Sequence, residues 1–71
     1  MERKFLIKWI NRWSGESGYV SKVMVSKKHF INTFDASRAK KYRTKDDAKS
    51  EISLLNTMGE GINNEFVINE A

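Results

Sequence analysis

The sequence predicts a small α+β domain, an antiparallel sheet of about four strands with one helix packed on one face, in the order β-β-β-α-β. Three observations predict this fold. Apolar residues alternate with period two in residues 4–13 and again in residues 64–70, which is typical of half-buried strands. Residues 44–58 instead place apolar side chains at helical spacing. With 71 residues only one modest core fits, so we expect a single domain over residues 1–71.

The first strand is expected over residues 4–13, where Phe5, Ile7 and Trp9 point inward. Residues 14–18 hold two glycines among small polar residues, a composition typical of a hairpin loop. A second strand should then run from about residue 19 to residue 27.

Residues 28–43 are the ambiguous part of the chain. Phe30, Ile31 and Phe34 fit either an irregular third strand or a loop that plugs the core, and we favour the strand. Asp35 is a suitable N-cap for one helical turn over residues 35–39. In the short extended piece that follows, Tyr42 is expected to point inward.

The clearest element is the helix over residues 44–58. Thr44 is a good N-cap, and Asp46 and Asp47 favour the positive end of the helix dipole. Gly59 suits a left-handed C-cap. Residues 64–70 complete the sheet as its last strand.

One helix covers only one face of such a sheet, yet apolar residues also occur on the opposite face. An apolar face rimmed by basic residues indicates a surface for a second copy of the chain or for another partner. The alternative is that residues 30–34 fold across it. The residues expected on this second face are Leu6, Ile10, Val20, Met24 and Val67.

Composition excludes several classes of site. The chain has no Cys and a single His, so neither a disulfide framework nor a Cys- or His-based metal site is expected, and we predict no cofactor. The longest apolar runs are three residues long, too short for a bilayer, and the N-terminus lacks the apolar core of a signal peptide. We therefore expect a protein that acts inside the cell and does not bind or span a membrane.

No group of residues predicts catalysis. Asp46 and Asp47 are adjacent on a helix and point in different directions. His29 is a lone imidazole in a basic stretch, and the Gly59-Glu60-Gly61 run follows a helix, whereas phosphate-binding loops follow a strand. We expect the protein not to be an enzyme.

Charge is distributed unevenly along the chain. Residues 1–49 contain all thirteen Lys and Arg and five acids, a net charge of +8, whereas the four acids that follow give −4. This asymmetry indicates a charged partner, either phosphates or an acidic protein, although such a run also forms ordinary solvated surface. The densest basic run comprises Arg38, Lys40, Lys41, Arg43, Lys45 and Lys49.

Two aromatic residues beside the hairpin loop are candidate contact residues. Trp13 and Tyr19 flank the loop among Arg, Ser and Gly, a composition typical of interface anchors. Trp13 also fits the edge of the core, and both interpretations stay open at this point.

The stretch from Phe34 to Ala48 joins an acidic turn, an Ala-Lys-Lys-Tyr strand and a Thr-capped helix. It resembles small accessory and effector proteins of phages and prophages of Gram-positive bacteria, and the likeness loosely covers most of the chain. The resemblance implies a stoichiometric inhibitor of a host protein such as a CRISPR or restriction nuclease, acting in the bacterial cytoplasm. The alternative that it implies is a small basic nucleic-acid-binding regulator.

Overall fold

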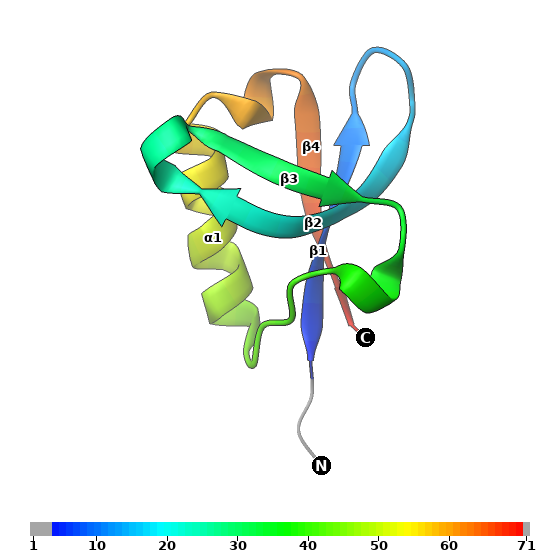
Figure 1. The fold of residues 1–71 in the computed structure, drawn as a ribbon, viewed down its shortest axis with the longest axis vertical. Helices are drawn as coiled ribbons and strands as arrows, with labels where there is room; N and C mark the ends of the chain where they lie inside the picture. Colours follow the sequence, from blue (N-terminus) through cyan, green and yellow to red (C-terminus); the bar gives the residue numbers. More distant parts are fainter. Residues whose placement is uncertain (1–3, 71) are drawn as a thin grey trace.

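A four-stranded antiparallel sheet forms the frame of the structure, a computed structural model that describes residues 4–70 (Figure 1). The strands are β1 (Phe5–Asn11), β2 (Ser17–Met24), β3 (His29–Thr33) and β4 (Asn64–Glu70). Their order across the sheet is β3-β2-β1-β4. The predicted α+β class and the β-β-β-α-β order are confirmed, and the ambiguous third segment is a strand.

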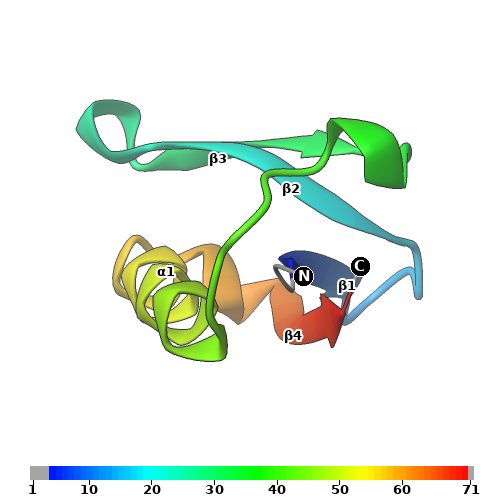
Figure 2. The same cartoon turned by 90° about the horizontal axis from the view of Figure 1, so that it is seen from below.

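Unequal pairing of β1 gives the sheet its curvature. β4 pairs with β1 over its whole length, from Phe5↔Glu70 to Asn11↔Asn64. β2 pairs only with residues 8–10 of β1, and an isolated bridge between Phe5 and Tyr42 takes its place at the other end. The β2–β3 hairpin therefore leaves β1 and lies over it, so that Figure 2 shows β2 and β3 in one layer and β1, β4 and α1 (Lys45–Thr57) in the other.

Helix α1 begins and ends where local chemistry predicts. The backbone N–H of Asp47 donates to Thr44 Oγ1 at 3.1 Å, which caps the first turn. Gly59 follows the helix in the left-handed conformation, with φ of 88°, which glycine adopts without steric cost. The residues that α1 contributes to the core are Ala48 and Leu55, both fully buried, with Ile52 packed beside them.

The core lies between the two layers. β1 contributes Phe5, Ile7 and Trp9, as the period-two pattern predicts. Phe66 and Ile68 of β4 pack against this cluster. The remaining members are Val20 and Phe30 from the hairpin layer and Tyr42 from the bridge.

The prediction that Val20 belongs to the second face is wrong. Val20 is fully buried in the core. In a regular strand Met24 would lie on the same face as Val20, but Met24 does not belong to the core cluster. The ladder between β2 and β3 shifts between Val20 and Lys22, where a β-bulge adds one residue. Beyond the bulge Val23 packs on the core opposite Phe30, because one extra residue exchanges the two faces of a strand.

Short 3₁₀ turns connect the other elements. β2 ends at Met24 rather than continuing to residue 27, because η1 (Val25–Lys27) turns the chain with Lys28 at φ of 51°. The turn η2 (Ala36–Arg38) has Asp35 as its N-cap, as predicted, and a third turn, η3 (Glu60–Ile62), precedes β4. Hydrogen bonds from the Ser37 hydroxyl and backbone N–H hold the pKa of Asp35 below its ordinary value.

Within residues 4–70, no helix is long and apolar enough to cross a membrane.

Candidate functional site

The β1–β2 hairpin and the η3 turn together hold Trp13 at one end of the molecule. Asn11 Oδ1 accepts from the backbone N–H groups of Trp13 and Ser14, each at 2.9 Å, which closes the hairpin turn. Trp13 Nε1 donates to Asn63 Oδ1 at 3.1 Å, and the Arg12 backbone N–H donates to Asn63 O at 2.8 Å. The indole is thus fixed in position although 78% of the residue is exposed.

Ile62 adds a second exposed apolar side chain on η3, 72% exposed, in the segment that holds Trp13. We call Trp13 and Ile62 together the Trp13 end. Tyr19, the other aromatic contact candidate, is half-buried and pairs with Lys8 and Thr33 within the sheet. The structure therefore makes Trp13 part of the surface and does not bring Tyr19 to the same loop.

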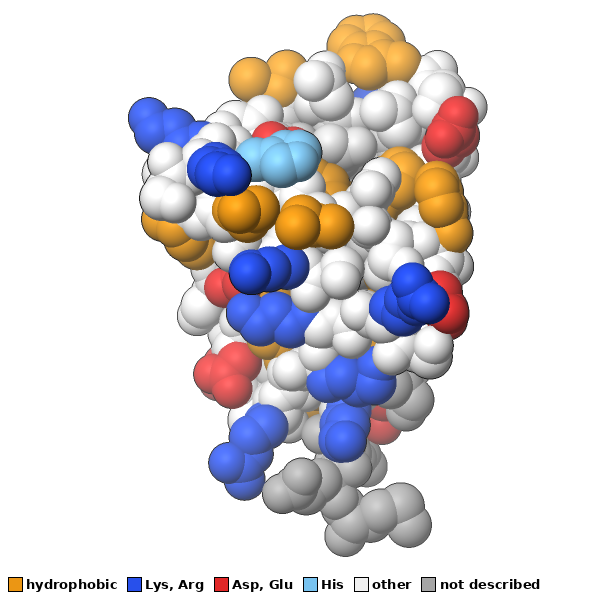
Figure 3. Space-filling view, in the orientation of Figure 1, with side chains coloured by type: hydrophobic (Ala, Val, Ile, Leu, Met, Phe, Trp, Pro, Cys, Tyr) orange, Lys and Arg blue, Asp and Glu red, His pale blue; other side chains and the backbone are white. Residues whose placement is uncertain are grey.

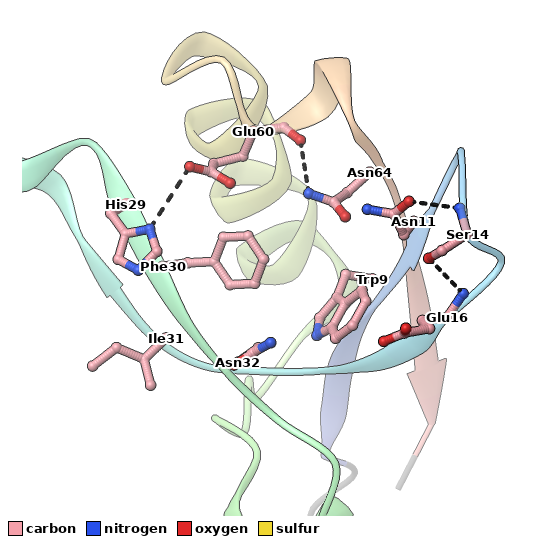
Figure 4. A pocket seen from close by; sticks show the side chains of 10 residues that line it. All are labelled: Trp9, Asn11, Ser14, Glu16, His29, Phe30, Ile31, Asn32, Glu60 and Asn64. Carbon is pink, nitrogen blue, oxygen red and sulfur yellow. Dashed lines mark hydrogen bonds and ion pairs between the residues drawn. The ribbon is translucent and has the colours of Figure 1, made fainter.

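A cleft of about 490 Å³ opens between β3, the η3 turn and the β1–β2 hairpin. Figure 4 shows the rings of Trp9 and Phe30 in the middle of this cleft, with Glu60 and Glu16 on different sides of them. Its volume falls in the range typical of ligand pockets. The lining residues are Trp9, Asn11, Ser14, Glu16, His29, Phe30, Ile31, Asn32, Glu60 and Asn64.

The charge of the cleft contrasts with that of the chain. The chain carries a net charge of +4, yet Glu16 and Glu60 line the cleft and no Lys or Arg of residues 4–70 does. His29 Nδ1 lies 3.9 Å from Glu60 Oε1 on one side of the cleft (Figure 4). In Figure 3 acidic side chains lie on both sides of the upper half of this face, and Lys or Arg side chains lie beside the histidine at its left edge as well as lower on the face.

One polar atom in the wall of the cleft has no partner. Trp9 is only 5% exposed, and its Nε1–H is buried without a hydrogen-bond acceptor within residues 4–70. Figure 4 shows this nitrogen on the side of the indole that faces Asn32. A buried donor without an acceptor costs free energy, and so it marks a place where an acceptor oxygen would be stabilising.

The basic run is divided by ion pairs and by the geometry of α1. Lys40 Nζ lies 3.0 Å from Glu51 Oε1, and Arg38 Nε lies 3.9 Å from Asp35 Oδ2. Lys41 Nζ donates to the carbonyls of Ala36 and Ala39, each at 3.2 Å. These three cations therefore also stabilise the chain around η2, and Arg43 follows them in the same segment.

Lys45 and Lys49 lie on a different flank of the helix. At 100° per residue, they fall on one side of the buried Ala48–Leu55 stripe, whereas Glu51, the partner of Lys40, falls on the other. The run does not form one continuous patch. Lys22, an exposed residue of β2, was not predicted with the run.

The second face keeps part of its predicted apolar character. Ile10, Met24 and Val67 are half-buried, and Leu6 is buried at 5% exposure. Val20 does not belong to this face, because it is buried in the core. Among residues 4–70 no group of three His, Cys, Asp or Glu side chains is placed to hold a metal ion.

Sequence reasoning missed the cleft. It assigned Trp9 to the inward side of its strand, which is correct, but did not bring Glu16 and Glu60 together. The signal that the sequence did contain is an Asn near the end of three strands, at positions 11, 32 and 64. Asn at strand ends is so common in turns that this pattern predicts no cleft by itself.

The fold and its surface define a class: a small α+β protein with a curved four-stranded sheet, one covering helix and an open cleft beside an edge strand. Comparison with models of protein families, with curated proteins and with solved structures finds no match to this chain. The functional proposals below therefore rest on the chain's own geometry and charge and on the sequence resemblance described above.

Proposed function

We propose that this chain is a non-enzymatic binding protein, a phage-type stoichiometric inhibitor that occupies a host protein such as a CRISPR or restriction nuclease. The observation that carries the binding role is Trp13, which is 78% exposed and yet held by a 3.1 Å hydrogen bond from its own Nε1. The phage setting and the kind of target come from the sequence resemblance.

An exposed indole of fixed orientation suits an interface anchor for two reasons. Trp is among the residues that contribute most binding free energy when a partner buries them. Because Asn63 already restricts the ring, binding loses little side-chain entropy. Ile62, 72% exposed on η3, is a second apolar side chain that a partner could bury there.

The test is affinity capture from a bacterial lysate, with and without nuclease treatment. The wild-type chain should retain a host protein after nucleic acid is digested. Trp13→Ala should weaken that complex by about 30-fold or more, the loss expected for a hot-spot residue. The purified target should then be inhibited fully by one molar equivalent of the wild-type chain.

Phe34→Ala is the matched control, because Phe34 is also a large aromatic residue with 70% exposure, but its ring packs edge-on against Trp9 and not in the loop that holds Trp13. It should leave capture unchanged, and circular dichroism should show that both variants fold. Equal capture by wild type and Trp13→Ala, or capture that disappears with nuclease, would contradict the proposal.

A second candidate function, nucleic-acid binding, is favoured by one observation. Lys22 is exposed on β2, the strand that contacts η2, and Figure 3 shows several Lys and Arg side chains in the lower half of the face that it draws. Lys22→Glu should then weaken binding to a random DNA duplex, and the affinity of the wild type should fall steeply with salt. Lys49→Glu, on the far flank of α1, is the control with the same change in charge. An equal effect of both variants would indicate only net charge.

A further inference from the structure

The cleft runs along the free edge of β3. Four consecutive residues of this strand line it, from His29 to Asn32. Successive side chains of a strand point to opposite faces, so a cleft on one face would be lined by every second residue. A cleft that all four residues line must lie beside the edge of the strand. β3 is the terminal strand of the sheet, and this is its unpaired side.

The backbone of β3 is available on that side. Apart from its ladder with β2, the backbone of His29–Thr33 makes no hydrogen bond to another backbone group within residues 4–70. An edge strand therefore presents N–H and C=O groups to the cleft, and such a row is a template for an added strand.

Two features of the cleft wall define what would fit beside this edge. The carboxylates of Glu16 and Glu60, with no Lys or Arg of the described residues in the lining, favour a cationic group. The Trp9 Nε1–H has no acceptor and no exposed surface, so it would meet an acceptor oxygen of a ligand once neighbouring side chains shift. An extended peptide with a basic residue supplies both, because every peptide unit carries a carbonyl.

We propose that the free edge of β3 pairs with an extended peptide segment of the partner protein, and that a Lys or Arg of this segment lies between Glu16 and Glu60. The identity of that partner rests on the proposed function, but the pairing itself does not. The five residues of β3 span about 17 Å, and so a segment of about five residues matches the strand.

The probe is a synthetic pentapeptide of sequence Thr-Val-Arg-Val-Thr, acetylated and amidated, added to the ¹⁵N-labelled wild-type chain. Nuclear magnetic resonance spectra should show shifts at the amides of His29–Thr33 and a downfield shift of the Trp9 indole N–H. The indole N–H of Trp13, which is already bonded to Asn63, should not move.

Three altered probes separate the contributions. Replacing Arg by Glu should abolish binding if Glu16 and Glu60 recognise the cation, and N-methylation of the peptide backbone should abolish it if strand pairing is required. Spermidine, which is cationic but has no peptide groups, should bind at least tenfold more weakly than the pentapeptide. Equal binding of any of the three would overturn the proposal.

Glu60→Gln should weaken the pentapeptide about three- to fivefold, the effect expected for one partly exposed ion pair, and less at high salt. Glu65→Gln is the matched control, because Glu65 lies on β4 opposite Ile10 and does not line the cleft. Shifts confined to β4 or to the second face, or no shift at millimolar peptide, would also overturn the proposal. The proposed function and the strand pairing can fail separately, because Trp13→Ala tests only the former. If this variant loses capture of the host protein but the pentapeptide does not bind at β3, only the strand pairing is excluded.

Discussion

Gly18 and Trp9 lie so close across the β1–β2 ladder that a Cβ on residue 18 would be 2.8 Å from Trp9 Cζ2. The same atom would be 2.9 Å from the backbone oxygen of Thr33, which has little freedom to retreat. Gly18→Ala should therefore destabilise the protein by about 1–3 kcal/mol, as overpacking does. Urea denaturation measures the loss, and Ser17→Ala, at the exposed neighbouring position, should stay near wild type.

Val20→Ala tests the corrected position of Val20. Because Val20 is fully buried in the core, removing two methyl groups should lower the free energy of unfolding by about 2 kcal/mol. Val25→Ala makes the same change at 56% exposure and should have little effect. If the two variants unfold at the same denaturant concentration, Val20 does not belong to the core.

Tyr42 gives the protein a dependence on alkaline pH. Burial, and then the charge of Glu51, raise the pKa of Tyr42 above its ordinary value. As pH rises above about 10, the unfolded chain releases the phenolic proton while the folded chain retains it, so stability should fall. Tyr42→Phe should reduce this fall, measured by urea denaturation between pH 8 and 11.

The same variant tests the Tyr42 hydroxyl at neutral pH. Tyr42 Oη is buried without a hydrogen-bond partner in the described chain. The negative charge of Glu51 affects this hydroxyl, although the Glu51 carboxylate is itself paired with Lys40. Tyr42→Phe should thus be as stable as wild type or more stable at pH 7. A loss above about 1 kcal/mol would instead indicate a hydrogen bond between Oη and the Glu51 carboxylate.

Thr44→Ala should cost about 1 kcal/mol of stability, because it removes the acceptor of the Asp47 N–H at the start of α1. Thermal denaturation followed by circular dichroism measures this loss. Ser50→Ala, on the exposed side of the same helix, is the control, and an unchanged melting temperature for Thr44→Ala would show that another group caps the helix.

Asn63→Ala should release the indole of Trp13 by removing the acceptor of its Nε1–H. The ¹⁵N relaxation of that indole should then report faster motion, while the backbone bond from Arg12 to Asn63 keeps the loop in place. Asn56→Ala is a control on α1. An indole equally rigid in both variants would show that packing rather than the hydrogen bond holds Trp13.

The sequence predicted those elements whose chemistry is local. The cap at Thr44, the left-handed Gly59 and the turn at Asp35 depend on neighbouring residues alone, and each was found where predicted. The inward side of β1 and β4 was also predictable, because period two needs only a regular strand.

Only the tertiary structure decided what depends on register and on residues distant in sequence. The bulge after Val20 exchanges the faces of β2, and no residue type in Val20–Lys22 marks it. Glu16 and Glu60 come to one cleft because β2 leaves β1 and the sheet curves, which is a property of strand pairing. Local propensity fixes each element, but the pairing of the elements determines which side chains come into contact. The candidate site consists of side chains from elements that are distant in sequence.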